Sequence, residues 1–391
     1  MQISAVHAAR ILTPLEEIRD AVVVVEDGRI TAVGHRDELQ LPSGATEYAA
    51  PGMTLVPGFV DLHIHGAGGH DVMEATPEAM AAVATAAVRA GTTSLVATTV
   101  TAPLDATCRS LEGMADFIAG VDNQPPNPQP RAEFLGIHLE GPFISRARRG
   151  VHPLESIAAP SIETLDRLLE AARGTTRILT LAPERPGALE VIEHAVAKGL
   201  LVALGHTDAT YEEARAAIAS GARHAVHVFN AMRPFSHRET GVLGAVLTDP
   251  SVTVEVIADG VHVDDAALRL LLAVKGASRV LLVSDGTAAT GMPDGSYHLG
   301  ALDVIVKDGV CRNREGRLAG STLTLDRALR RMVALGVPLL EAVQMATLHP
   351  ARRLGIAGRK GVIAAGADAD LVLLSDSLQV AGVMVRGAGL F

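Results

Sequence analysis

The sequence contains no tryptophan and only two cysteines, and each shortage excludes a class of protein. Without tryptophan, the chain cannot build a tryptophan-lined platform for carbohydrates. Cys108 and Cys311 lie far apart in the sequence, so we expect no disulfide framework and a reducing, cytoplasmic environment. The opening stretch lacks a basic segment followed by a long apolar run, so we expect no signal peptide.

Long runs of positive charge and long uncharged apolar runs are also missing. The formal net charge is -10, and the longest basic cluster is Arg146-Ala147-Arg148-Arg149. Proteins that bind nucleic acids usually present a basic face, so we expect no nucleic-acid partner. The cluster is either a solvated loop or a contact near an anionic substrate. No apolar stretch reaches the roughly 18 residues of a membrane span, so we expect no membrane partner.

The two ends of the chain have the patterns of β-structure. Residues 21–34 form two short apolar runs around Asp27-Gly28, a pair that favours a tight hairpin. Residues 366–387 contain similar runs broken by glycine and aspartate. We therefore predict a small β-sandwich domain built from residues 1–54 and 359–391, with a different domain between them.

The middle part, residues 55–358, alternates apolar strand candidates with helix-like stretches. The eight strand candidates are residues 55–65, 92–100, 134–140, 177–184, 200–206, 222–230, 252–259 and 279–285. Helix-like stretches separate most of them, and Thr210 with Glu213 forms a capping-box pattern at the start of one. The pattern predicts an α/β fold with a closed (β/α)8 barrel. A doubly wound open sheet is the alternative, but no Gly-rich phosphate loop follows the first strand.

Three stretches interrupt this alternation. Residues 122–131 are a proline-rich connector, and residues 231–248 are expected to be a long loop where a helix would stand. Residues 286–320 form another long insertion, with a possible hairpin at 302–313. Long loops in compact domains are often functional.

Polar side chains stand at the carboxyl ends of the predicted strands, where (β/α)8 barrels carry their active sites. Residues of this kind are His63, His65, Glu140, His206, His227 and Asp285. The spacing of His63 and His65 places both on one face of a strand. Imidazole and carboxylate groups are preferred ligands of ions such as Zn²⁺, so these residues predict a metal centre. His138 shares the face of Glu140, and a supporting or core role is expected for it.

Several strings resemble those of N-acetylglucosamine-6-phosphate deacetylases in the amidohydrolase superfamily. They are HLEGPF (138–143), GHT (205–207), HVFNAM (227–232), ADGVHVD (258–264) and SDGTAATG (284–291). PGFVDLHIHG (57–66) and GVIAAGADADLVLL (361–374) resemble the opening and closing segments of the superfamily. The resemblance covers essentially the whole chain.

The resemblance implies roles for individual residues. Glu140, His206 and His227 would hold the principal divalent metal, which is Zn²⁺ or else Fe²⁺, Mn²⁺ or Co²⁺. His63 and His65 would allow a second ion, with Glu140 as a bridge. Asp285 would be the catalytic acid and base, and His152 would polarise the carbonyl group.

The resemblance also implies a set of substrate-binding residues. They are Val151, His152, Asn230, Ala231, Arg238, His262, Leu318, Ala319 and Gly320. Arg238 would reach the phosphate of a substrate bound to a neighbouring subunit, which implies a homodimer. The residues alone favour a different role for Arg238, as a surface salt-bridge partner of Glu239 or another acid.

The function implied is metal-dependent hydrolysis of the acetamide of N-acetylglucosamine 6-phosphate to glucosamine 6-phosphate and acetate, in amino-sugar catabolism or cell-wall recycling. Alternatives are deacetylation of N-acetylgalactosamine 6-phosphate or of N-acyl amino acids. A hydrolase of cyclic amides commonly has a carboxylated lysine where Glu140 stands. A non-enzymatic scaffold is the remaining alternative, against which the intact ligand set argues.

Overall fold

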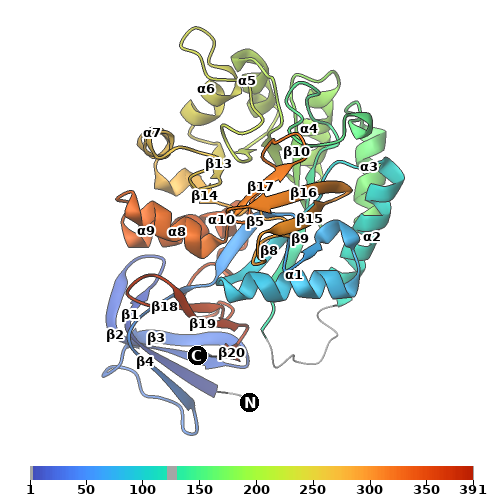
Figure 1. The fold of residues 1–391 in the computed structure, drawn as a ribbon. Helices are drawn as coiled ribbons and strands as arrows, with labels where there is room; N and C mark the ends of the chain where they lie inside the picture. The colour runs from blue at the N-terminus through green and yellow to red at the C-terminus, as the bar shows by residue number, and fades with distance from the viewer. Residues whose placement is uncertain (1–2, 121–129, 391) are drawn as a thin grey trace.

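The computed structural model describes residues 3–120 and 130–390. The proline-rich connector expected at 122–131 lies almost entirely outside these residues. Within them, eight parallel strands hydrogen-bond in chain order and form a barrel (Figure 1). These strands are β5 (Phe59–Ile64), β8 (Thr92–Thr98), β9 (Glu133–Glu140), β10 (Thr176–Leu181), β11 (Leu201–Leu204), β12 (His224–Ala225), β13 (Thr253–Val256) and β14 (Val280–Leu282).

The barrel closes between its first and last strands. The backbone N–H of His65 donates to the Gly286 carbonyl at 2.8 Å, and that of Asp285 donates to the His63 carbonyl at 2.9 Å. Closure removes exposed strand edges, and the predicted (β/α)8 architecture is confirmed.

Helices surround the barrel and follow its strands. They are α1 (Pro77–Arg89), α2 (Leu104–Gly120), α3 (Ile162–Ala171), α4 (Ala188–Ala197), α5 (Tyr211–Ala219), α6 (Gly241–Thr248), α7 (Asp265–Lys275), α8 (Leu325–Ala334), α9 (Leu339–Ala346) and α10 (Leu348–Arg353). Short 3-10 turns lie at Val72–Glu74, Leu154–Ser156 and Ala277–Arg279, and β6 (Gly66–Ala67) pairs with β7 (His70–Asp71). At α5, the Glu213 N–H donates to the Thr210 hydroxyl and the Thr210 N–H donates to the Glu213 carboxylate, which confirms the capping box.

Helix α6 contradicts the long loop expected over residues 231–248. Its first seven residues, Gly241–Leu247, are all buried. A helix buried on all sides has no polar face, so it lacks the amphipathic period by which helices are recognised in a sequence. Gly241 and Gly244 weaken the helix propensity further.

The insertion after β14 forms a small antiparallel sheet. Strands β15 (Gly295–Leu299), β16 (Leu302–Lys307) and β17 (Val310–Asn313) pair in that order, so the hairpin expected at 302–313 is present and has a third strand. The sheet crosses the front of the barrel in Figure 1. Its apolar side packs on Val100 and Ala289, which follow barrel strands β8 and β14.

Both ends of the chain enter one further sheet, which carries both marked termini in Figure 1. In the described residues its order is β20-β19-β18-β4-β1-β2-β3. The strands are β1 (Ile3–Leu12), β2 (Glu17–Glu26), β3 (Arg29–His35), β4 (Thr46–Pro57), β18 (Leu371–Leu374), β19 (Val380–Val385) and β20 (Ala388–Leu390). Asp27 and Gly28 both have positive φ at the predicted hairpin turn. The extra β-domain predicted from both termini is confirmed; in the described residues it is one seven-stranded sheet, in which β4 runs to Pro57.

A buried lysine joins this small domain to the barrel. The Lys360 ammonium lies 2.7 Å from Glu133 at the start of β9, and 2.9 and 2.7 Å from Asp368 and Asp370 beside β18. Burial alone would lower the pKa of Lys360, but the charges of Asp370, Glu133 and Asp368 raise it to about 12. The aspartates of the closing GADADLV segment therefore bind a lysine across the domain junction.

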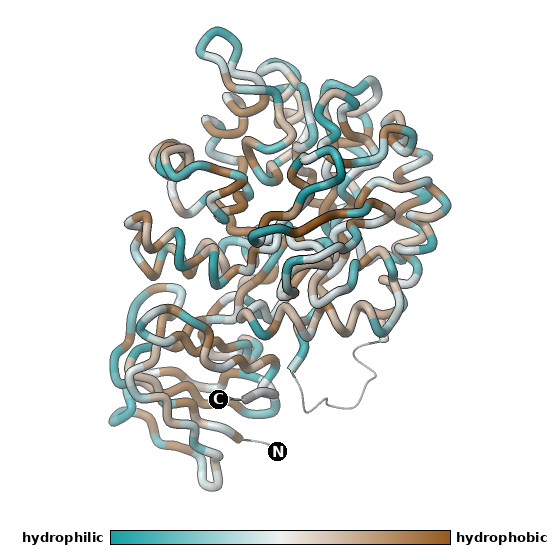
Figure 2. Tube along the Cα trace, in the orientation of Figure 1, coloured by the Kyte–Doolittle hydropathy of each residue, from teal (hydrophilic) through white to brown (hydrophobic). Residues whose placement is uncertain are grey.

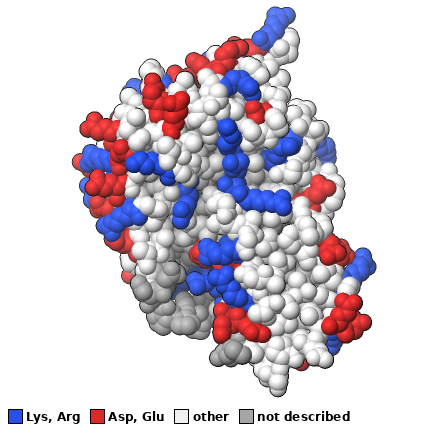
Figure 3. Space-filling view, turned by 180° about the vertical axis from the view of Figure 1, so that it is seen from behind, with Lys and Arg blue, Asp and Glu red and all other residues white. Residues whose placement is uncertain are grey.

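Hydrophobic segments concentrate along the strands inside both domains, and hydrophilic segments on the outer loops (Figure 2). Charge is uneven on the back of the molecule, where Lys and Arg side chains run down the middle and many Asp and Glu lie toward the edges (Figure 3). The negative charge of the chain is therefore not spread evenly over this face. None of the helices in the described part of the chain combines the length and apolar character that a membrane crossing needs.

Candidate metal centre

The carboxyl ends of the barrel strands surround a pocket of about 170 Å³. It is lined by His65, Val100, Glu140, Gly150, Val151, His152, His206, His227, Asn230, Ala231, His262, Asp285, Leu299, Leu318 and Gly320. His63 lies beneath this lining and is fully buried. The structure therefore brings together the six strand-end residues that the sequence singles out.

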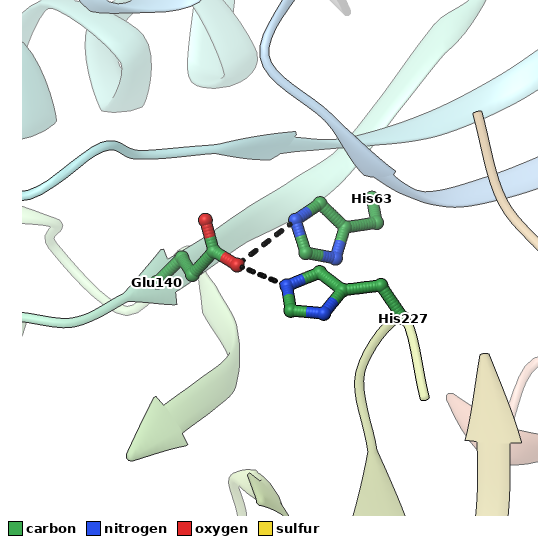
Figure 4. Close-up of side chains that lie close together, drawn as sticks. All are labelled: His63, Glu140 and His227. Carbon is green, nitrogen blue, oxygen red and sulfur yellow. Dashed lines mark hydrogen bonds and ion pairs between the residues drawn. The ribbon is translucent and has the colours of Figure 1, made fainter. Parts of the chain in front are cut away.

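Glu140 lies at the centre of the site, and Figure 4 shows its contacts with His227 and His63. Its Oε1 atom lies 2.9 Å from His227 Nε2, 3.1 Å from His206 Nε2 and 3.4 Å from His63 Nε2. The three residues expected to hold the principal metal thus meet at one carboxylate oxygen. Groups of three ligand atoms within 4.8 Å of one another divide these residues differently. One such group joins His227 with His63 and Glu140, and another joins His206 with His152 and Glu140.

Asp285 places a second carboxylate beside His63 and His65. Its Oδ1 atom lies 3.1 Å from His65 Nε2 and 3.6 Å from His63 Nε2. Burial alone would raise the pKa of Asp285, but the hydrogen bond from His65 and the charges of nearby histidines hold it at about 2. Asp285 is therefore ionised at neutral pH and can accept a proton.

Several residues that end barrel strands have backbone in the left-handed region. The φ angles are 47° at His206, 27° at His227 and 48° at Asp285, and Phe229 and Ala231 share this feature. Residues other than glycine rarely adopt such angles, which cost of order 1–3 kcal/mol each. Strain of this kind concentrates at functional sites, where it aims side chains that a regular strand would point elsewhere.

The hydrogen bonds of the histidines show which nitrogen faces the centre. His65 Nδ1 donates to the Thr98 carbonyl at 3.0 Å, and His206 Nδ1 donates to the Arg148 carbonyl at 3.1 Å. Carbonyl oxygens only accept, so each Nδ1 carries a proton, and Nε2 is the nitrogen that can give its lone pair to a metal once it has lost its own proton. His63 Nε2 is buried and has no hydrogen-bond partner in the described structure. This donor set fits a divalent metal.

In His152 the other ring nitrogen carries the proton, because Nδ1 accepts a hydrogen bond. The backbone N–H of Thr101 donates to His152 Nδ1 at 3.2 Å, so the ring proton is on Nε2. Burial and the charge of His206 lower the pKa of His152 to about 4. His152 is thus a neutral hydrogen-bond donor facing the pocket, with its Nε2 3.4 Å from Glu140 Oε2. His138 uses both ring nitrogens on Thr180 and the Leu62 carbonyl, which leaves neither for a metal.

Most residues expected to bind substrate line the pocket, and two do not. Ala319 is fully buried against the β15–β17 sheet, between its pocket-lining neighbours Leu318 and Gly320. Arg238 is exposed on the loop before α6 and lies outside the lining. Its suggested surface partner, Glu239, instead pairs with Arg233.

The basic cluster at 146–149 lies next to the site, and two of its arginines bond to protein groups there. Arg148 pairs with Asp208 at 2.7 Å, and Arg149 donates to the His152 carbonyl at 2.7 Å. Arg149 therefore helps to hold the backbone of His152 beside the pocket.

Sequence reasoning missed Val100, Gly150 and Leu299 in the lining and the deeper Glu255 and Thr101. Gly150 approaches His206 so closely that an added Cβ would lie 3.2 Å from its ring. A charged residue inside the apolar run VTVEVIAD was a usable signal for Glu255. Val100 and Leu299 carry no such signal, because apolar residues are equally common in the core.

Residues 54–389 match the profile of the Amidohydrolase family. The chain is 39% identical over 382 residues to the N-acetylgalactosamine-6-phosphate deacetylase of Escherichia coli O157:H7, covering 97% of each chain. It is 39% identical over 392 residues to the N-acetylglucosamine-6-phosphate deacetylase of Vibrio furnissii, covering 98% of this chain and 94% of that one.

A solved structure shows the same relationship in three dimensions. It is that of a mutant N-acetyl-D-glucosamine-6-phosphate deacetylase from Mycobacterium smegmatis in complex with N-acetyl-D-glucosamine-6-phosphate. The TM-score is 0.91 at 40% identity, and the match covers 100% of this chain and 99% of the other.

Proposed function

This chain belongs to the amidohydrolase family, and from that premise we propose that it hydrolyses the acetamide of N-acetylglucosamine 6-phosphate. The products are glucosamine 6-phosphate and acetate, and the reaction belongs to amino-sugar catabolism. The observation that carries this conclusion is the likeness to deacetylases of this substrate over nearly their whole length. The intact donor set at the strand ends argues against a scaffold without activity.

The family depends on divalent metals, and the described residues fit such an ion. Glu140, His206 and His227 would hold the principal ion, and His63 with His65 would hold a second one with Glu140 as a bridge. We propose Zn²⁺, because nitrogen and carboxylate ligands suit it. When bound, the ion supplies Lewis-acid chemistry that activates water and polarises the amide carbonyl.

Asp285 carries the proton in the proposed mechanism. Its carboxylate is ionised and accepts the proton that the attacking water loses. The same proton then passes to the amine nitrogen as the C–N bond breaks, so one carboxylate acts first as base and then as acid. The Nε2–H of His152 donates to the carbonyl oxygen as negative charge develops on it.

Recognition of the phosphate group requires donors and positive charge. Asn230 and His262 line the pocket, and Asp259 holds His262 Nδ1 at 2.7 Å. We propose that Arg238 reaches the phosphate in a neighbouring subunit of a homodimer. Its exposure, outside the lining of its own pocket, supports this assignment. We also place the enzyme in the cytoplasm, because Cys108 and Cys311 are unbridged thiols.

Steady-state kinetics with metal-reconstituted protein test the function. We expect the highest kcat/KM for N-acetylglucosamine 6-phosphate, and a loss of about 100-fold or more for the unphosphorylated sugar, because its charge-assisted contacts are missing. A higher kcat/KM for the galacto epimer would favour the alternative activity of the Escherichia coli relative. Equal rates with and without the phosphate would contradict the proposal.

A further inference from the structure

Glu255 is a carboxylate buried directly beneath the metal centre. It lies in β13, has no exposed surface and sits between two histidines. Its Oε2 atom is 2.9 Å from His63 Nδ1, and its Oε1 atom is 3.0 Å from His224 Nε2. Glu255 does not line the substrate pocket, and the mechanism above leaves it without a role.

A carboxylate at such a depth needs strong compensation. Burying a charge without partners costs several kcal/mol, and no lysine or arginine in the described chain forms an ion pair with Glu255. Its compensation comes from the two histidines, and His224 Nδ1 in turn contacts the Thr253 hydroxyl at 2.7 Å. A connected chain therefore runs from Thr253 through His224 and Glu255 to His63.

This chain fixes the orientation of His63. An ionised carboxylate only accepts hydrogen bonds, so His63 Nδ1 donates to it and the lone pair remains on Nε2. That Nε2 atom lies between Glu140 and Asp285, at 3.4 and 3.6 Å, and has no hydrogen-bond partner in the described structure. The arrangement is that of a carboxylate that orients a metal-bound histidine.

His63 differs in this respect from the other ligand candidates. His65 and His206 donate to neutral backbone carbonyls, whereas His63 donates to a full negative charge. A carboxylate partner makes the imidazole a stronger ligand than a carbonyl does. The Glu255 carboxylate also adds a negative charge below those of Glu140 and Asp285. These charges together favour binding of a second cation.

We propose that Glu255 is a positioning residue that holds His63 ready for a second divalent ion, so that this chain is built for two ions. The inference rests on the proposed metal centre. The competing explanation is structural, in which Glu255 only joins β13 to the neighbouring strands β12 and β5 through His224 and His63.

Metal titration of the Glu255→Gln variant separates these explanations. Glutamine keeps the size of the side chain but removes its charge. Metal-depleted protein is titrated with Zn²⁺ against a chelating dye, and bound zinc is counted by elemental analysis. We expect two ions per wild-type chain. In Glu255→Gln we expect an unchanged first site and a second site weakened by about 10- to 100-fold.

Two further variants and a spectrum control the result. The effect of Glu255→Gln on the second ion should vanish in a His63→Gln background, while Asp105→Asn, on the surface, should bind two ions like wild type. If Glu255→Gln does not fold, ¹⁵N spectra of histidine-labelled wild type decide. We expect His63 to carry its proton on Nδ1, and a proton on Nε2 would overturn the inference.

The remaining outcomes are distinct. Wild-type affinity for both ions in Glu255→Gln, together with a lower urea midpoint, would establish the structural explanation and overturn ours. A wild-type chain that binds only one ion would also overturn it. A wild-type chain that binds no ion would contradict the proposed function itself.

Discussion

Asp285 is an ionised carboxylate that contacts His65 and lies outside the contacts of Glu140 with His206 and His227, so its loss should spare the principal ion. In Asp285→Asn, we expect the ion held by Glu140, His206 and His227 to remain, while kcat falls by about 10²- to 10⁴-fold, because an amide cannot take the proton. Elemental analysis and kcat measured on the same sample check this. A loss of less than tenfold would contradict the acid–base role, and Asp105→Asn on the surface serves as the control.

His349 on α10 makes the stability depend on pH. Burial and the charge of Arg352 lower its pKa in the folded chain to about 4, whereas an unfolded histidine titrates near 6.5. Between these values only the unfolded state binds the proton, so stability falls as pH drops from 6.5 to 4 and is unaffected above 6.5.

The His349→Gln variant removes this proton uptake. Urea unfolding at pH 7 and pH 4.5 should show wild type losing more stability than the variant, by about 2 kcal/mol. Equal losses would show that other groups cause the acid sensitivity. His35→Gln at the surface is a suitable control.

Residues of the site were predictable where a polar side chain interrupts an apolar strand. His63, His65 and Glu140 stand out for this reason, and the structure places them together. The tautomers were not predictable, because they depend on partners far away in the chain, such as Thr101 for His152. Glu255 also interrupts an apolar strand, but its role was not predictable, since its two histidine partners lie on other strands.

Elements were predictable where burial follows a regular period. Helix α5 and the barrel strand β9 agree with the sequence pattern within a residue or two. Residues 222–230, expected as a full strand, contain only β12 (His224–Ala225). After Ala225 the chain enters a strained turn, in which His227 and Phe229 have positive φ. No local sequence pattern predicts positive φ at residues of these types.

The end of strand β11 tolerates no side chain at Gly205. A Cβ atom there would lie 2.2 Å from Val226, which follows β12, and 2.9 Å from Thr180 in β10. Gly205→Ala should therefore push the strands apart, lower the free energy of unfolding by about 1–3 kcal/mol and reduce kcat by displacing His206.

Urea unfolding and kinetics of the Gly205→Ala variant check this expectation. Gly358→Ala is the matched control, because nothing lies within 4 Å of its added Cβ. It should change stability by less than about 0.5 kcal/mol. Equal stability of the two variants would show that the barrel relaxes around Gly205 without strain.

At the scale of the whole molecule, the proposed dimer makes one site from two chains. Arg238→Gln should raise KM for N-acetylglucosamine 6-phosphate by about tenfold or more and leave the unphosphorylated sugar unaffected, because only the charge-assisted phosphate contact is lost. Steady-state kinetics on both sugars measure this difference. Equal effects on both sugars would remove the phosphate assignment.

Mixing two impaired variants, at a substrate concentration below the KM of Arg238→Gln, tests the sharing directly. Arg238→Gln and Asp285→Asn chains should regain about a quarter of wild-type activity when subunits exchange, because each mixed dimer contains one complete site. No recovery, despite demonstrated exchange, would place Arg238 in its own pocket.

The small domain also has a consequence for the order in which the chain is made. Strand β4 is paired on one side with β1 and on the other with β18, which follows the entire barrel in the sequence. At about 5–20 residues per second, a ribosome delivers β18 some 15 s to 1 min after β4. Until then one edge of β4 is open to other nascent chains. The final strands therefore protect newly made protein from aggregation, and cells translating this chain slowly should depend more on chaperones.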